Sequence, residues 1–230
     1  QNFGLLTPLL IMSFIMFAAI IFAFFFLPTT PTRTLEDTPL SRPVLDKNLK
    51  YLLAIGVIIF TSFAIFQSVT AYYLQDRFLL SLNETAKSTA LVLGSMAAMS
   101  IVSQLTIVQS FKGSPLRLIW WSIPFFLASS IVIVFSYNFN WVLIGMSLMG
   151  LGMGLASPGY TASASLNADK NNQGAAVGLA MIAPGVGFAL GPLLSGFLYQ
   201  ANLTFPFLFT IPLFLIASFF IFQLDEKSFQ

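Results

Sequence analysis

The sequence predicts an all-α polytopic membrane protein with seven transmembrane helices. Of its 230 residues, 57% are hydrophobic and only 8% are charged, whereas a soluble domain has about 25% charged residues. Seven stretches approach or exceed the roughly 20 apolar residues that a bilayer span needs, and no charged residue falls well inside any of them. The predicted spans are 5–27, 51–74, 89–111, 118–137, 141–162, 174–199 and 205–222.

The residue types that are missing exclude several functions. The chain has no Cys and no His, which removes disulfides, Cys/His zinc sites and Ser-His-Asp catalysis. We therefore expect neither an enzyme nor a bound metal or cofactor. The net charge of +2 is too small to suggest a nucleic-acid partner, so the partners we expect are the lipid bilayer and a small-molecule substrate.

The first connection differs from all the others. Segment 28–50 is polar, contains four Pro residues and holds seven charged residues, and the later connections are much shorter. This pattern predicts three parts: residues 1–27 as the last helix of an N-terminal bundle, residues 28–50 as a cytoplasmic linker, and residues 51–230 as a six-helix bundle. On this interpretation an N-terminal half of the same chain precedes the sequence.

The basic residues predict an orientation. Lys and Arg near span ends are retained on the cytoplasmic side, and eight of the ten lie in segments 28–50, 112–117 and 163–173 and in the C-terminal tail. The alternate loops hold only Arg77 and Lys87. The N-terminus is therefore predicted outside and the C-terminus in the cytoplasm. All six Tyr and three Trp residues lie near span ends, which we interpret as an aromatic belt at the membrane boundary.

Glycine is concentrated in the spans 141–162 and 174–199. Gly150 and Gly154 lie one turn apart on one helix face, and Gly187, Gly191 and Ser195 recur at every fourth position. Such small-residue stripes let two helices approach closely in lipid. Pro184 and Pro192 predict a bend in span 174–199. Static packing is the alternative for any single Gly, whereas the combined pattern is typical of helices that slide or rock against their neighbours.

Two sequence segments carry a resemblance to a known family. Residues 173–178 (QGAAVG) and 187–196 (GFALGPLLSG) resemble the eleventh helix of major facilitator superfamily transporters, closest to the drug:proton antiporter branch. Residues 73–77 (YLQDR) are similar to the outer end of the family's seventh helix. The resemblance makes the seven spans helices six to twelve of that fold. It departs from the family at residues 111–117 (FKGSPLR), where the acidic residue of a family motif is missing.

The resemblance implies proton-coupled multidrug efflux, and hence drug resistance, by alternating access in the inner (plasma) membrane of a bacterium. It places spans 51–74, 89–111, 141–162 and 174–199 around a central cavity, and spans 118–137 and 205–222 against lipid. No span contains an ionisable residue, so the carboxylate that carries the proton is expected in the N-terminal half. Asp76 and Arg77, at the outer end of span 51–74, are candidates for an extracellular gate or are solvated end charges.

Uncharged polar and soft apolar side chains on the cavity spans suit large hydrophobic compounds, because thioethers adapt their shape to different ligands. Ordinary helix packing is the alternative for each Met. The candidate residues are Gln67 and Thr70 in span 51–74, Met96, Met99 and Gln104 in span 89–111, Met146, Met149 and Met153 in span 141–162, and Met181 and Phe188 in span 174–199.

Other functions stay open at this point. The same fold could carry a sugar, an amino acid or a siderophore, and a subunit of a larger membrane complex would need only the Gly-rich packing. A seven-helix receptor or photoreceptor fits the span count, but no span contains a Lys that could hold retinal, no charged triplet ends span 89–111, and the long first loop would divide the bundle.

Overall fold

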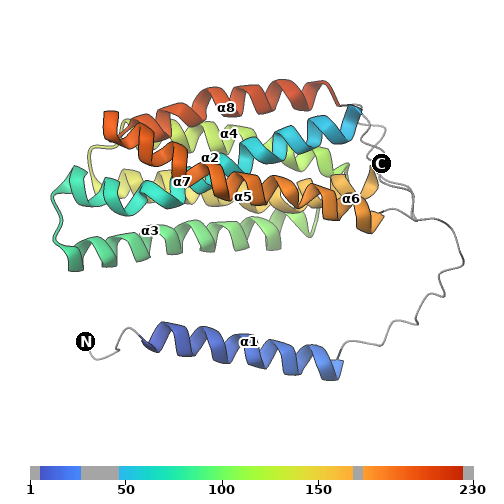
Figure 1. Ribbon diagram of the computed structural model, residues 1–230, viewed down its shortest axis with the longest axis horizontal. Helices are drawn as coiled ribbons and strands as arrows, with labels where there is room; N and C mark the ends of the chain where they lie inside the picture. Colours follow the sequence, from blue (N-terminus) through green and yellow to red (C-terminus); the bar gives the residue numbers. More distant parts are fainter. Residues whose placement is uncertain (1–5, 27–46, 168–172, 225–230) are drawn as a thin grey trace, which may run out of the picture. The chain divides into compact units, whose positions relative to one another are not determined.

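The computed structural model describes residues 6–26, 47–167 and 173–224, and within them the regular secondary structure is helical (Figure 1). The chain divides into two compact units, Gln1–Pro39 and Leu40–Gln230. This division falls inside the predicted linker 28–50, most of which lies outside the described residues. The first unit contains α1 (Leu6–Phe26), an apolar helix whose described side chains are exposed.

The second unit is a bundle of membrane-length helices. Six helices of the described residues are long and apolar enough to cross a membrane, which confirms the predicted all-α membrane fold. One of them is α3 continued by the short π-helix η1, and another is formed by α6 and α7 together. The elements are α2 (Lys47–Phe78), α3 (Leu82–Ser103), η1 (Gln104–Val108), α4 (Pro115–Val134), α5 (Phe139–Leu166), α6 (Gln173–Ala180), α7 (Ile182–Ala201) and α8 (Phe205–Phe222).

Local signals set where these helices begin. The Ser81 hydroxyl accepts from the Glu84 backbone N–H at 3.4 Å, while the Glu84 carboxylate accepts from the Ser81 N–H at 2.9 Å. This reciprocal capping box starts α3 seven residues before the predicted apolar span, whose limit reflected hydropathy alone. Similarly, α4 begins with Pro115, and the Asn138 side chain caps α5 by accepting from the Trp141 N–H at 3.2 Å.

The six spans form two groups of three in chain order, and each group packs against the other. The first group is α2, α3 with η1, and α4; the second group is α5, α6 with α7, and α8. In the first group, α2 packs along α7 and α8 of the second group. In the second group, α5 packs along α3 and α4 of the first group, and α4 also packs on α8. The first helix of each group thus lies against the second and third spans of the other, as expected for a half-bundle built from two inverted repeats of three helices.

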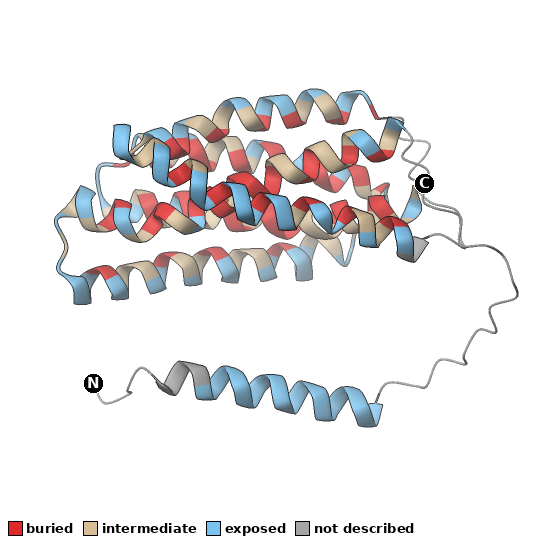
Figure 2. Cartoon of the chain, viewed as in Figure 1, coloured by how far each residue is buried: buried red, intermediate tan, exposed pale blue. Residues whose placement is uncertain are grey.

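Burial is uneven across the bundle. Figure 2 shows buried positions along α2 and α5, whereas much of α3 and α7 is exposed. The core contains large side chains such as Phe66, Phe126 and Phe214, and several buried hydroxyls have hydrogen-bond partners. The Ser129 hydroxyl donates to the Gly145 carbonyl at 2.7 Å. The least covered surfaces of the bundle therefore belong to α3 and α7.

The predicted aromatic belt needs one correction. Tyr73 and Tyr160 are almost fully buried, at 0% and 1% exposure, so for these two residues the belt interpretation is wrong. Each ring packs between helices and each hydroxyl binds a backbone carbonyl: Tyr73 donates to Ile133 and Tyr160 donates to Ala180. The other seven Tyr and Trp residues are half-buried or exposed.

Candidate functional site

The crossing of α5 and α3 is made by glycines. A Cβ added at Gly150 would overlap the Met96 carbonyl oxygen, and one added at Gly154 would overlap the Ser103 hydroxyl and the Ser100 carbonyl. The backbones of the two helices therefore touch directly, which any larger residue would prevent.

The crossing of α7 and α2 is built in the same way. A Cβ at Gly187 would lie 2.7 Å from the Thr61 backbone nitrogen, and one at Gly191 would overlap the Ala64 side chain. Ser195, one turn further along α7, is buried and its hydroxyl donates to the Pro192 carbonyl at 3.0 Å. Both small-residue stripes thus lie where a helix of one group meets a helix of the other.

The predicted bend in span 174–199 is an interruption at Met181, which separates α6 from α7. It lies three residues before Pro184 and eleven before Pro192. Pro192 lies inside α7, which continues past it without interruption, and is exposed; a bend at that position stays a prediction. Pro184 has no N–H to donate to the carbonyl of the residue four positions earlier, Ala180.

Tyr160 of α5 supplies that missing donor. Its hydroxyl donates to the Ala180 carbonyl at 2.8 Å, and its ring meets Phe60 of α2 edge-on with centroids 5.7 Å apart. The approach is close enough that a Cβ at Gly56 would lie 2.5 Å from the Tyr160 ring. Tyr160 was not among the predicted site residues, although Pro184 signals a carbonyl that needs another partner.

Asp76 and Arg77 both make hydrogen bonds within the bundle. The Tyr199 hydroxyl of α7 donates to the Asp76 carboxylate at 2.6 Å. The Arg77 guanidinium donates to the Ser136 carbonyl, in the turn between α4 and α5, at 3.1 Å. Beside it, the Tyr73 hydroxyl lies 2.7 Å from the Ser136 hydroxyl. These contacts join α2 to α7 and to the α4–α5 turn at one end of the bundle, and the predicted gate role stays a prediction.

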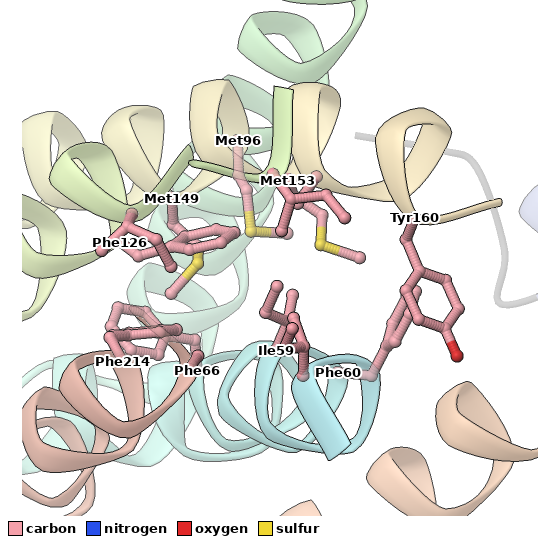
Figure 3. Close-up of a cluster of buried hydrophobic side chains, with 14 of the residues drawn as sticks. Ile59, Phe60, Phe66, Met96, Phe126, Met149, Met153, Tyr160 and Phe214 are labelled. Carbon is pink, nitrogen blue, oxygen red and sulfur yellow. The ribbon is translucent and has the colours of Figure 1, made fainter. Parts of the chain in front are cut away.

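Half of the predicted cavity residues lie inside the bundle core. Figure 3 shows Met96, Met149 and Met153 directed into the cluster that also holds Phe66 and Phe126. Met146 is also fully buried, with its sulfur 3.8 Å from the hydroxyl of the buried Thr70. These five positions pack helices together and present almost no surface to a ligand in this arrangement, and Met99 is half-buried.

The exposed candidates fall into two groups. On one surface, Phe188 of α7 meets Phe63 of α2 edge-on at 6.1 Å between ring centroids, and the exposed Gln67 follows Phe63 by one turn. Met181, 44% exposed, marks the α6–α7 interruption. Separately, the exposed Gln104 begins the π-helix η1, and its amide donates to the Ser100 hydroxyl at 3.4 Å. Phe63 was missed because one more Phe in a Phe-rich span carries no signal.

Comparison with known proteins identifies the family. The chain matches the Major Facilitator Superfamily over residues 1–183 and again over residues 114–228. Among curated proteins no significant match is found. Because the family matches extend over α1 and over the whole described bundle, the chain belongs to the major facilitator superfamily of membrane transporters.

Proposed function

We propose that this chain is the C-terminal half of a secondary active transporter. Its six-helix bundle and an N-terminal bundle of the same protein rock about a binding site between them. The observation that carries this proposal is the exposed surface of α2 and α7 holding Phe63, Gln67 and Phe188. It combines apolar rings with one uncharged amide, a composition suited to a substrate-facing wall.

The substrate class follows from that composition. Phe63 and Phe188 offer ring faces and edges to an apolar or cationic compound, and Gln67 offers one amide for orientation. Hydrophobic drug-like compounds therefore suit this wall better than sugars, which need many hydrogen-bonding groups. Members of this superfamily are transporters, so we propose a transport role and not an enzymatic one. Because the wall suits hydrophobic drug-like compounds, we propose that the transport is efflux.

Proton coupling would come from outside the described bundle. Among the described residues the carboxylates are Asp76 and Glu84, and both lie near helix ends. A carboxylate in the interior of a membrane span is the usual proton carrier. We therefore propose that the titrating group belongs to the N-terminal half, and that the protein lies in a bacterial plasma membrane with the C-terminus in the cytoplasm.

A transport assay tests the activity. The full-length protein is expressed in everted membrane vesicles, and uptake of ethidium is followed by fluorescence with and without a protonophore. We expect energised uptake that the protonophore abolishes, and a several-fold change in ethidium KM for Gln67→Ala and Phe188→Ala. Uptake of sugars or amino acids in place of ethidium would assign another cargo to the same fold.

Cysteine accessibility tests the wall directly and separates a transporter from a structural subunit. Phe188 of α7 and Ile131 of α4 are both 46% exposed in the bundle, so they form a matched pair. The present sequence contains no native Cys. In the full-length protein, Phe188→Cys should react with a polar thiol reagent faster than Ile131→Cys. Equal rates would mean that no water-filled cavity reaches α7 and would contradict the proposal.

A further inference from the structure

A groove lies on the bundle between the beginning of α4 and the end of α8. Its volume is about 440 Å³, within the range of small-molecule sites. Arg117, Trp120 and Trp121 of α4 line one wall, and Ile221 and Phe222 of α8 line the other. Gln67 of α2 and Phe188 of α7 are not among the lining residues, so the groove is a separate feature from the proposed transport wall.

Aromatic contacts shape the apolar part of the groove. Trp120 meets Phe222 across it with ring centroids 4.4 Å apart. Trp121 is held by Phe111 from the preceding loop at 5.1 Å. Trp121 nevertheless remains 45% exposed and Phe222 71% exposed, so both offer surface to a bound molecule. Tryptophan favours the level of the lipid head groups, where the ring is in apolar surroundings and its N–H meets water.

The charged part of the groove is basic. Arg117 lines it, and the exposed Lys112 lies in the short loop that precedes α4. Among the described residues, the carboxylates Asp76 and Glu84 lie at the opposite end of the bundle, in the last turn of α2 and the first turn of α3. Arginine binds phosphate groups through two parallel N–H donors. Basic grooves between membrane helices recognise anionic lipid head groups for this reason.

We propose that this groove is a binding site for an anionic phospholipid. The Arg117 guanidinium binds the lipid phosphate, Trp120 and Trp121 contact the glycerol region, and the first part of an acyl chain lies against Ile221 and Phe222. The combination of one cation at the beginning of α4 with an apolar wall beside it suits a lipid better than free phosphate, which would leave that wall without a partner. The proposal does not depend on the transport function.

Lipid titration tests the proposal. The full-length chain is purified in detergent and titrated with dioleoylphosphatidylglycerol or dioleoylphosphatidylcholine, and bound lipid is measured by native mass spectrometry. We expect tighter binding of the phosphatidylglycerol, because the two lipids share acyl chains and differ in net charge. Arg117→Gln should weaken phosphatidylglycerol binding about fivefold, the usual contribution of one basic residue near an anionic membrane surface, and leave phosphatidylcholine binding unchanged.

Controls make either outcome decisive. Lys87→Gln removes an exposed basic residue at the opposite end of the bundle and should change nothing. Displacement of phosphatidylglycerol by millimolar inorganic phosphate would assign the site to free phosphate and overturn the lipid proposal. Equal affinity for both lipids in the unmodified chain would also overturn it, whatever the variants show.

The tail supplies one more test. Asp225 and Glu226 follow Leu224 in the sequence and lie outside the described residues. Asp225→Asn with Glu226→Gln should leave phosphatidylglycerol binding as tight or tighter, since the proposal gives these acidic groups no part in holding the phosphate. A loss of binding in this variant would mean that acidic groups carry the site, and would contradict the proposal.

Discussion

The Tyr160 hydroxyl donates to the Ala180 carbonyl at 2.8 Å, across the space between α5 and the interruption of α6 and α7. Ala180 is the residue whose carbonyl Pro184 cannot satisfy, because proline has no N–H. Tyr160 and Ala180 are both buried, so water cannot replace the tyrosine hydroxyl as the donor to this carbonyl. A side chain of one helix thus completes the backbone hydrogen bonding of another at the point where that helix breaks.

This relationship predicts a specific coupling. Tyr160→Phe keeps the ring but leaves the Ala180 carbonyl without a donor, which should lower the free energy of unfolding by about 1–3 kcal/mol. Pro184→Ala restores a backbone N–H to that carbonyl, so Tyr160→Phe should cost markedly less in the Pro184→Ala background. Thermal unfolding in detergent of the four proteins of this double-mutant cycle measures the difference.

Hydrogen exchange locates the effect. In Tyr160→Phe the amides of 176–181 should exchange faster, whereas Tyr137→Phe, which changes an exposed hydroxyl, should alter neither exchange nor stability. If Tyr160→Phe costs the same with and without Pro184, the hydroxyl does not replace the donor that proline lacks.

The α5–α3 crossing should tolerate no side chain at its centre. Gly150→Ala places a methyl group against the Met96 carbonyl, a rigid backbone atom, and should destabilise the bundle by about 2 kcal/mol or more. Gly94→Ala on α3 is the control, because a Cβ there has nothing within 4 Å. That variant should be neutral or more stable by up to about 1 kcal/mol, since alanine favours the helix. Similar melting temperatures for the two variants would argue against the close crossing.

The α7–α2 crossing allows the same comparison within one helix. Gly191 lies against Ala64, whereas Gly185 has open space where a Cβ would point. Gly191→Ala should therefore lower the unfolding temperature, and Gly185→Ala should not. Pairing Gly191→Ala with Ala64→Gly removes the overlapping methyl group and should recover most of the loss. Absence of recovery would mean that the destabilisation arises elsewhere.

Tyr73 and Tyr199 make hydrogen bonds at the C-terminal end of α2, and they should contribute differently to stability. Tyr73 is fully buried and its hydroxyl meets both Ser136 and the Ile133 carbonyl, so Tyr73→Phe should cost about 1–3 kcal/mol of stability. Tyr199 bonds to the exposed Asp76, where water competes, and Tyr199→Phe should cost less than about 1 kcal/mol. Chemical unfolding of both variants gives the comparison, and a reversed order would contradict these assignments of burial.

Much of the architecture followed from the sequence. Long apolar segments separated by charged loops predict membrane helices, because burying a charge or an unpaired peptide group in lipid is costly. The stripes Gly150–Gly154 and Gly187–Gly191–Ser195 also marked faces that proved to lie at helix crossings. Hydropathy was less accurate at helix ends, as at Ser81, because capping depends on local hydrogen bonds.

Only the tertiary structure decided which side of each helix faces inward. Met146 and Met149 are buried whereas Met181 and Phe188 are exposed, yet all four look alike in the sequence. In a soluble protein the polar face of a helix marks the outside. In a membrane span the lipid and the protein interior are both apolar, so the sequence pattern carries no such mark. The partner of Ala180 was hidden for a related reason: Tyr160 lies twenty residues away along the chain, and only the packing of α5 against α6 brings the two together.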